Sequence, residues 1–317
     1  MIDELMRVPD DFVLPFQIET SGARGRLVRM GPAISAILSK HDYPQAVSEL
    51  LGEAMTLTAM LGASLKFEGK FILQTSSQGP VNFLVAHYDA PGNLRGYASF
   101  DESAFETGAA GSLSQTACLL GDGHMAMTID QGPEMERYQG VVPLEGDTIA
   151  EAADLYFRQS EQLPTVIKIA IARHYEGGKD SKPGSWSWRA GGLMVQKLTE
   201  DGGSAASNGH DVEDAWTRAK LLAATVEDHE LLDPMLAPER LLYRLFHEER
   251  VRAFEAKPLS AFCHCSRDHI EQMLANFSRE ELEDMVEDGA VQVTCQFCKT
   301  RYDFDANMLR SKDNLLQ

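Results

Sequence analysis

Four of the five cysteines in this 317-residue chain lie in two close pairs near its C-terminal end. Cys263 and Cys265 stand in AFCHCSRDH, and Cys295 and Cys298 stand in TCQFC. A unit of about sixty residues has a marginal apolar core, so it usually needs a disulfide, a metal ion or a partner chain to stay folded. Five cysteines are too few for the disulfide framework of a secreted protein, so this clustering indicates metal or redox chemistry in a reducing compartment.

The spacing within each pair suits a zinc ion bound by sulfur. Zinc prefers four ligands in a tetrahedron, about 2.3 Å from each sulfur, and a CxxC turn presents two thiolates on one side of the ion. Cys295 and Cys298 match this half-site. Cys263 and Cys265 form a CxC, which can serve as the other half where the backbone bends. We therefore predict one zinc ion bound by all four cysteines.

Three further residues with ligand or thiol chemistry are expected to have structural roles. His264 and His269 lie close to the first cysteine pair, and histidine is a common zinc ligand. Since four cysteines already complete a tetrahedron, both histidines are expected to be exposed. Cys118 lies in the apolar stretch TACLLGDG and is expected to be a small buried side chain.

The energies of zinc and of disulfides differ enough to make a switch physically feasible. Zinc in a small protein site contributes about 10–16 kcal/mol of folding free energy. Disulfides that close loops of three or four residues contribute only about 1.5–2 kcal/mol each. Neighbouring cysteines can reach the Cα separation of about 4.4–6.8 Å that a disulfide needs, so an oxidant could exchange the metal for disulfides and unfold the tail. Spacing alone leaves two alternatives open, a purely structural zinc site and a redox switch.

Charge and hydropathy exclude several other classes of function. The formal net charge of −19 would repel a phosphate backbone, so nucleic acid is not an expected partner. The acidic start MIDELMRVPDDF lacks the basic flank and apolar run of a signal peptide, and no stretch has eighteen consecutive apolar residues. We expect a cytoplasmic protein that does not enter a membrane.

The pattern along the chain predicts an α+β fold in three parts. Strand-like runs separated by turns dominate up to about Lys197, and two segments with helical spacing, residues 42–66 and 148–162, interrupt them. The strand-like runs are FQIET, GRLVRM, KFILQTSS, VNFLVAHY, NLRGYASF, HMAMTID, VIKIAIA and LMVQKL. We predict a strand-rich N-terminal domain with packed helices over residues 1–204.

A helical linker is predicted for residues 205–258, after the polar boundary stretch GGSAASNGH at 202–210. Apolar residues fall at helical spacing from Val212 to Val226, and a second helix starts with Pro238 at its first position. Two interpretations of these helices stay open. They are either packed permanently on the first domain or able to dock and undock.

Residues 259–317 are predicted to form a small α+β zinc-binding domain. Ser266 can cap one helix, and Ser278 with Glu281 forms a capping box for a second helix that stops at Gly289. The strands AVQVTC and TRYDFD flank the CQFC turn.

The cysteine pattern and four other stretches resemble one known family. The stretches are YQGVVPL (138–144), YFRQSEQLPT (156–165), AGGLMVQ (190–196) and YRLFHEE (243–249). Together with CHC and CQFC in an acidic chain, they resemble the bacterial redox-regulated heat-shock chaperone family of thirty-three kilodaltons. The resemblance covers nearly the whole chain.

This resemblance implies a specific mechanism. It implies that the reduced, zinc-bound protein is inactive, and that oxidation forms Cys263–Cys265 and Cys295–Cys298 disulfides, releases zinc and unfolds the tail and linker. The active form would be a homodimer that holds unfolding client proteins without ATP. The amphipathic linker agrees with this, because a holdase needs apolar surface that is hidden until it is required.

The stretch from Ala172 to Gly192 departs from the family pattern by its length. We expect a surface hairpin extension here, in which Trp186 and Trp188 are candidates for contacts with clients.

Two other functions compete with a chaperone. A zinc deaminase is suggested by HEE at 247–249 followed by a CxxC, but Thr294 stands where that signature requires proline, and four cysteines would close the metal site. A constitutive zinc-ribbon adaptor would have the same cysteines and ignore oxidants. No GxGxxG after a strand, Walker loop, GxSxG or HExxH motif is present, so we predict that the protein is not an enzyme.

Overall fold

The computed structural model describes residues 10–65, 69–106, 116–132, 135–177, 184–198, 209–287 and 289–305. It divides into two compact units, Met1–Ala261 and Phe262–Gln317. The three-part division at residues 204 and 258 stays a prediction. Among the described residues, no helix is long and apolar enough to cross a membrane.

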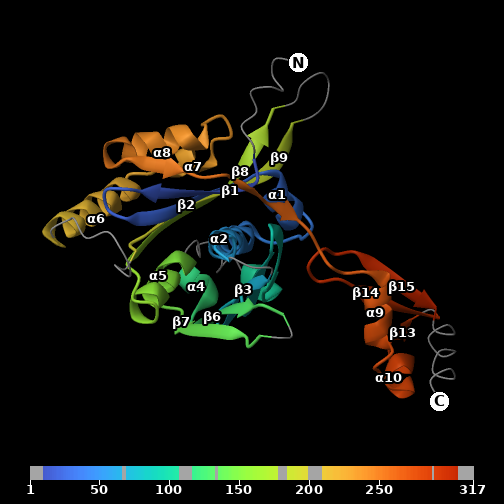
Figure 1. Ribbon diagram of the computed structural model, residues 1–317. Helices are drawn as coiled ribbons and strands as arrows, with labels where there is room; N and C mark the ends of the chain where they lie inside the picture. The colour runs from blue at the N-terminus through green and yellow to red at the C-terminus, as the bar shows by residue number, and fades with distance from the viewer. Residues whose placement is uncertain are drawn as a thin grey trace. The chain divides into compact units, whose positions relative to one another are not determined.

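Two six-stranded sheets form the frame of the first unit (Figure 1). Sheet 1 has the order β10-β1-β2-β9-β8, with β11 beside β1, and sheet 2 has the order β12-β5-β4-β3-β6-β7. The strands of sheet 1 are β1 (Phe12–Ile18), β2 (Ala23–Met30), β8 (Thr165–Glu176), β9 (Ser185–Gln196), β10 (Val251–Ala253) and β11 (Lys257–Pro258). The strands of sheet 2 are β3 (Lys70–Ser77), β4 (Phe83–Asp89), β5 (Asn93–Ser99), β6 (Gly123–Asp130), β7 (Tyr138–Pro143) and β12 (Ser260–Ala261). Each expected strand-like run therefore contributes to a strand.

The long helix α2 (Gln45–Gly62) lies between the two sheets (Figure 1). It is apolar on nearly every side, as a helix buried on all faces must be, and it packs on Val28 and Met194 of sheet 1 and on Leu73 of sheet 2. The shorter helices of this layer are α1 (Pro32–Leu38), α3 (Glu102–Glu106), α4 (Thr116–Leu120) and α5 (Ile149–Gln159). Thr148 caps α5 by accepting a hydrogen bond from the Glu151 backbone N–H.

The opposite, outer face of sheet 1 is covered by the helices of the linker. These are α6 (Gly209–Ala224), α7 (Asp228–Leu232) and α8 (Pro238–Phe246), followed by the 3₁₀ turn η2 (His247–Glu249). Side chains alternate along β2, so that Val28 joins the core around α2 while Leu27 joins a second core with α6 and α8. The second core is large and apolar, and it includes Phe12, Leu14, Phe16, Ile18, Leu193, Val195, Trp216, Leu241, Leu242, Leu245 and Phe246.

Three very short strands follow α8 and attach the chain to both sheets. β10 and β11 pair antiparallel with β1, and β12 pairs parallel with β5. β11 and β12 each make only two residue pairs, so they have little stability of their own. The sequence did not reveal these strands, because two or three residues carry no detectable period.

Cys118 corrects one expectation, because it is exposed and not buried. It lies in α4, whose apolar contacts come from the next two residues, Leu119 and Leu120, both almost fully buried. A helix of five residues can bury only one side, and Cys118 lies outside that side.

The extension between Ala172 and Gly192 is a long hairpin of β8 and β9, as expected. Its tip, residues 178–183, lies outside the described residues. Trp186 is 58% exposed and packs against Tyr175 and Arg173, whereas Trp188 is packed against the core around α2. Of these two tryptophans, Trp186 is therefore the one that offers a large exposed surface.

Glu53 joins three helices inside the first unit. Its carboxylate on α2 accepts hydrogen bonds from the Ala150 backbone N–H of α5 (3.1 Å) and from the Thr116 hydroxyl of α4 (3.4 Å). Burial raises the pKa of Glu53 to about 7, and the hydrogen bonds at the start of α5 only partly oppose that effect.

The ionisation of Glu53 is expected to make the first unit less stable as pH rises. Its folded-state pKa lies above that of an unfolded glutamate, so the folded chain binds more protons and the free energy of unfolding falls as pH rises toward and through about 7. We expect a loss of about 2 kcal/mol between about pH 5.5 and pH 8 from this group. Denaturant unfolding of the wild type and of Glu53→Gln, each at several pH values, measures this loss. An identical pH slope in both proteins would contradict the prediction.

The second unit is built from short elements around a very small core. Its helices are α9 (Arg267–Leu274) and α10 (Arg279–Asp284), and its sheet is β13 (Val286–Glu287), β14 (Ala290–Thr294) and β15 (Arg301–Asp305). Ser266 caps α9 and the Ser278–Glu281 capping box starts α10, both as predicted. The buried core consists of Ile270, Leu274, Leu282, Val291 and Phe304.

The end of α10 corrects the prediction that this helix stops at Gly289. The helix ends at Asp284, and β13 then pairs antiparallel with β14. Gly289 has a φ of +83° in the tight connection between these two strands, which explains the glycine there. A glycine that permits a positive φ ends a helix or turns a hairpin equally well, so its sequence position was ambiguous.

Candidate metal centre

Two connections bring the four cysteines of the second unit together. Cys263 and Cys265 lie on the segment that leads into α9, and Cys295 and Cys298 lie in the turn between β14 and β15. The backbone N–H of Cys295 donates to Thr300 O (2.9 Å), and that of Lys299 donates to Cys295 O (2.8 Å). Lys299 has a φ of 56°, so the turn bends sharply at this point.

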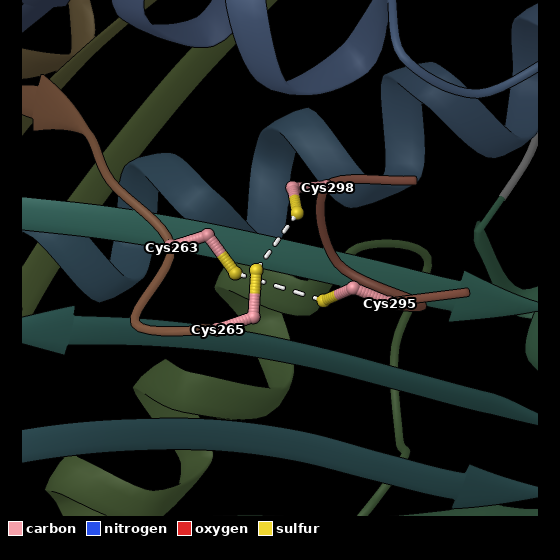
Figure 2. A group of neighbouring side chains, drawn as sticks. All are labelled: Cys263, Cys265, Cys295 and Cys298. Atoms are coloured by element: carbon pink, nitrogen blue, oxygen red, sulfur yellow. Dashed lines mark hydrogen bonds between the residues drawn. The ribbon is translucent and has the colours of Figure 1, made fainter. Parts of the chain in front are cut away.

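The four sulfur atoms converge on one point (Figure 2). All of them lie within 4.8 Å of one another. Two sulfur contacts join one pair to the other, at 3.7 Å between Cys263 Sγ and Cys295 Sγ and 3.2 Å between Cys265 Sγ and Cys298 Sγ. A tetrahedron with metal–sulfur bonds of about 2.3 Å has edges of about 3.8 Å between sulfurs, so these separations suit a single ion. The cluster is therefore able to hold one metal ion.

Two neighbours of the cluster were not singled out in the sequence. The Tyr302 hydroxyl on β15 donates to Cys265 Sγ and to Cys265 O, both at 3.3 Å. Thr300 Oγ1 lies 3.2 Å from Cys298 Sγ. Both residues follow CQFC closely in sequence. This closeness in sequence was the only signal that could have pointed to them. Hydrogen bonds of this kind orient metal ligands and tune their basicity.

The four sulfurs are close enough to change one another's pKa values. Burial raises the pKa of the Cys265 thiol to about 12, and hydrogen bonds to the neighbouring sulfurs add to the rise. Burial opposes ionisation of Cys298 as well, but hydrogen bonds with Thr300 and with the thiols of Cys265 and Cys295 lower its pKa to about 6. Four adjacent thiolates repel one another, so a bound cation is needed to keep all of them ionised, and its binding releases protons.

The histidines near the cysteines lie outside this cluster. The group of possible ligands contains the four cysteines alone among the described residues, and His264 and His269 are exposed, as expected. The edge of the Phe262 ring packs against the His264 ring, with centroids 4.8 Å apart.

The HEE stretch serves a structural purpose in the first unit. Glu249 is 5% exposed and accepts hydrogen bonds from Arg218 on α6 and from the Thr20 hydroxyl. The hydrogen bond from Arg218 is the main reason that the pKa of Glu249 is lowered, so this residue is an ionised partner in an ion pair. A deaminase needs this glutamate free to act as an acid and base beside zinc.

Comparison with known proteins identifies the family. The family model described as Hsp33 protein matches residues 11–305. This chain belongs to the Hsp33 family. The 33 kDa chaperonin of Caulobacter vibrioides is 46% identical over 300 residues, which cover 94% of this chain and 96% of that protein. The 33 kDa chaperonin of Nitrosococcus oceani is 40% identical over 291 residues, which cover 92% of this chain and 90% of that one.

The fold also matches a solved Hsp33 structure. The crystal structure of the 33 kDa chaperonin from Thermotoga maritima aligns with a TM-score of 0.74, covering 97% of this chain and all of that one, at 22% identity. This likeness confirms the predicted α+β fold.

Hsp33 proteins are redox-regulated chaperones, and this chain is one of them. It is not an enzyme, as predicted, so the deaminase alternative is excluded. A constitutive adaptor that ignores oxidants is excluded because this family consists of redox-regulated chaperones. The resemblance seen in the sequence is confirmed.

Proposed function

We propose that the reduced chain binds one zinc ion through Cys263, Cys265, Cys295 and Cys298, and that oxidation replaces this ion with two disulfides. Loss of the ion unfolds the second unit and loosens the linker helices α6 to α8 from sheet 1. The uncovered surface then binds unfolding client proteins without ATP. The observation that carries this proposal is the convergence of all four sulfurs within 4.8 Å.

The pairing of the disulfides determines what oxidation does. Two of the sulfur contacts run between the pairs, and disulfides formed there would close loops of more than thirty residues, each worth about 3.7 kcal/mol in the chain-entropy model. Such bonds would staple the unit shut. Cys263–Cys265 and Cys295–Cys298 disulfides close loops worth only about 1.5–2 kcal/mol each. We therefore propose the neighbouring pairs, because only they let the unit unfold.

The surface that becomes available is the outer face of sheet 1 together with the inner faces of α6 and α8. Phe16 of β1 stacks on Phe246 of α8, with ring centroids 5.7 Å apart, at the centre of this contact. The linker ends at β11 and β12, which make two residue pairs each, and Phe262 follows directly in the chain. Unfolding of the second unit removes the support at this end of the linker.

Client proteins follow from the chaperone family, and we propose that the oxidised chain forms a homodimer in the cytoplasm. The net charge of −19 supports this function, because like-charge repulsion keeps a protein with exposed apolar surface in solution.

Oxidation is expected to start chaperone activity and release zinc together. Reduced protein should leave the aggregation of a thermally unfolding client unchanged, whereas peroxide or hypochlorous acid at elevated temperature should release one zinc per chain and suppress aggregation. A metal-sensitive dye measures zinc release and light scattering measures client aggregation in the same sample. Peptide mapping then identifies the disulfides. The molar mass from static light scattering shows whether the oxidised protein is a dimer. Equal suppression by both forms, or cross-linked pairs in the active form, would contradict the proposal.

A further inference from the structure

A cavity of about 360 Å³ lies between the two sheets of the first unit. It is lined from sheet 1 by Arg24, Arg26 and Gln196, and from sheet 2 by Phe71, Met127 and Ile129. The end of α2 and the residues in and after α5 complete its wall. Its volume falls in the range of about 300–1,000 Å³ that is usual for sites that bind small molecules.

Three of the stretches that marked this chain as a family member meet at the cavity. Tyr138 comes from YQGVVPL, Tyr156 and Glu161 come from YFRQSEQLPT, and Gln196 comes from AGGLMVQ. The cysteine switch uses none of these residues. A separate role for this part of the fold would account for their convergence.

Arg26 is the unusual side chain of the cavity. It lies on β2 between Pro15 of β1 and Met194 of β9, and only 9% of its surface is exposed. Among the described residues, nothing accepts a hydrogen bond from its guanidinium or forms an ion pair with it. Burial, with a smaller effect of Arg24, lowers its pKa to about 10, so it is still cationic at neutral pH.

Two other buried arginines of the first unit have partners within the protein, although Nη2 of Arg29 finds none among the described residues. Arg29, three residues along the same strand, donates to Leu231 O (3.4 Å) and Leu236 O (2.7 Å) on the opposite face of sheet 1. Arg189 forms a two-pronged ion pair with Asp10, at 2.9 and 2.8 Å. Among the described residues, no Arg26 nitrogen is a fully buried atom without a partner, so the guanidinium opens into the cavity, where it can pair with an anion.

The remaining walls of the cavity define the rest of the ligand. Glu161 also lies in the wall, and its Oε1 is held there by hydrogen bonds from the Tyr138 hydroxyl (3.0 Å) and the Tyr156 hydroxyl (2.5 Å). Arg24 adds a second, exposed positive charge at the rim. The rest is largely apolar, with Leu61, Leu65, Phe71, Met127, Ile129, Phe157 and Leu163 in the wall.

We propose that this cavity binds an amphipathic carboxylate, whose anionic head pairs with Arg26 and whose aliphatic chain lies against the apolar wall. A planar guanidinium recognises a carboxylate through two parallel hydrogen bonds, and the apolar wall gains from the chain that it removes from water. Because the ligand contacts both sheets and the end of α2, its binding stabilises the folded first unit.

Titration calorimetry of the reduced, metal-loaded full chain with decanoate tests the proposal. We expect saturable binding of one decanoate per chain and a rise in the melting temperature of the first unit with decanoate concentration. Decanol has the chain without the charge, and acetate has the charge without the chain, so each should bind at least tenfold more weakly. Equal binding of decanol and decanoate would overturn the proposal without the need for any variant.

Two variants in sheet 1 locate the site. Arg26→Met removes the buried charge and keeps an unbranched side chain of similar length, and it should weaken decanoate binding at least tenfold. Arg252→Met removes the same charge from an exposed residue of β10 that does not line the cavity, and should change binding less than threefold. An unchanged affinity in Arg26→Met, or equal losses in both variants, would overturn the assignment of the anion to Arg26.

Discussion

Removal of the metal from the reduced chain, or the change Cys298→Ser, is expected to unfold the second unit while the first unit stays folded. Among the described residues, the core of the second unit contains five buried side chains, Val291 and Phe304 among them. A core of this size contributes little stability after the loss of chain entropy, whereas a zinc ion contributes about 10–16 kcal/mol. Loss of one thiolate removes a large part of this stabilisation.

Hydrogen exchange measured by mass spectrometry reports each unit separately. In the metal-free or Cys298→Ser chain, the amides of α9, β14 and β15 should lose protection, while those of α2 and β3 should keep it. Cys118→Ser is the matched control, because it makes the same chemical change at an exposed cysteine of the first unit. Persistent protection of β14 and β15 after complete metal loss would show that the apolar core alone holds this unit.

Replacement of Phe246 with aspartate is expected to activate the chaperone without oxidation. Phe246 is fully buried in the contact between α8 and sheet 1, where it stacks on Phe16. An unpaired carboxylate in this apolar contact costs several kcal/mol, which is enough to displace the linker helices. The reduced, zinc-loaded variant should therefore suppress the aggregation of a thermally unfolding client, and its zinc content should remain one ion per chain.

Tyr243→Asp provides the control for this experiment, since Tyr243 lies on the same helix but is 65% exposed. It adds the same charge to α8 and should leave the reduced protein inactive. Limited proteolysis between α6 and α8 shows whether the helices have left the sheet. If Phe246→Asp frees the linker and the protein still lets the client aggregate, the covered face of sheet 1 is not the surface that binds clients.

Local patterns accounted for much of the fold and for the whole cysteine cluster. Cap residues such as Ser266 and Ser278 act within one helical turn, so their effect is visible in a few residues of sequence. The spacing of CxC and CxxC reports in the same way on which thiols can face one ion. Gly289 shows the limit of such patterns, because the identity of its turn depended on pairing between β13 and β14.

The sequence by itself determined which four cysteines gather in one cluster, which helices are amphipathic, and that the chain belongs with redox-regulated chaperones. Only the tertiary structure decided that α6 and α8 cover the outer face of sheet 1, that Cys118 is exposed, and that Arg26 lines a cavity of the first unit. The physical reason is the separation along the chain between the residues that interact. Thiol spacing and helix capping act between near neighbours, whereas burial depends on which distant segment arrives, as with Thr20 and Glu249, which are 229 residues apart in sequence.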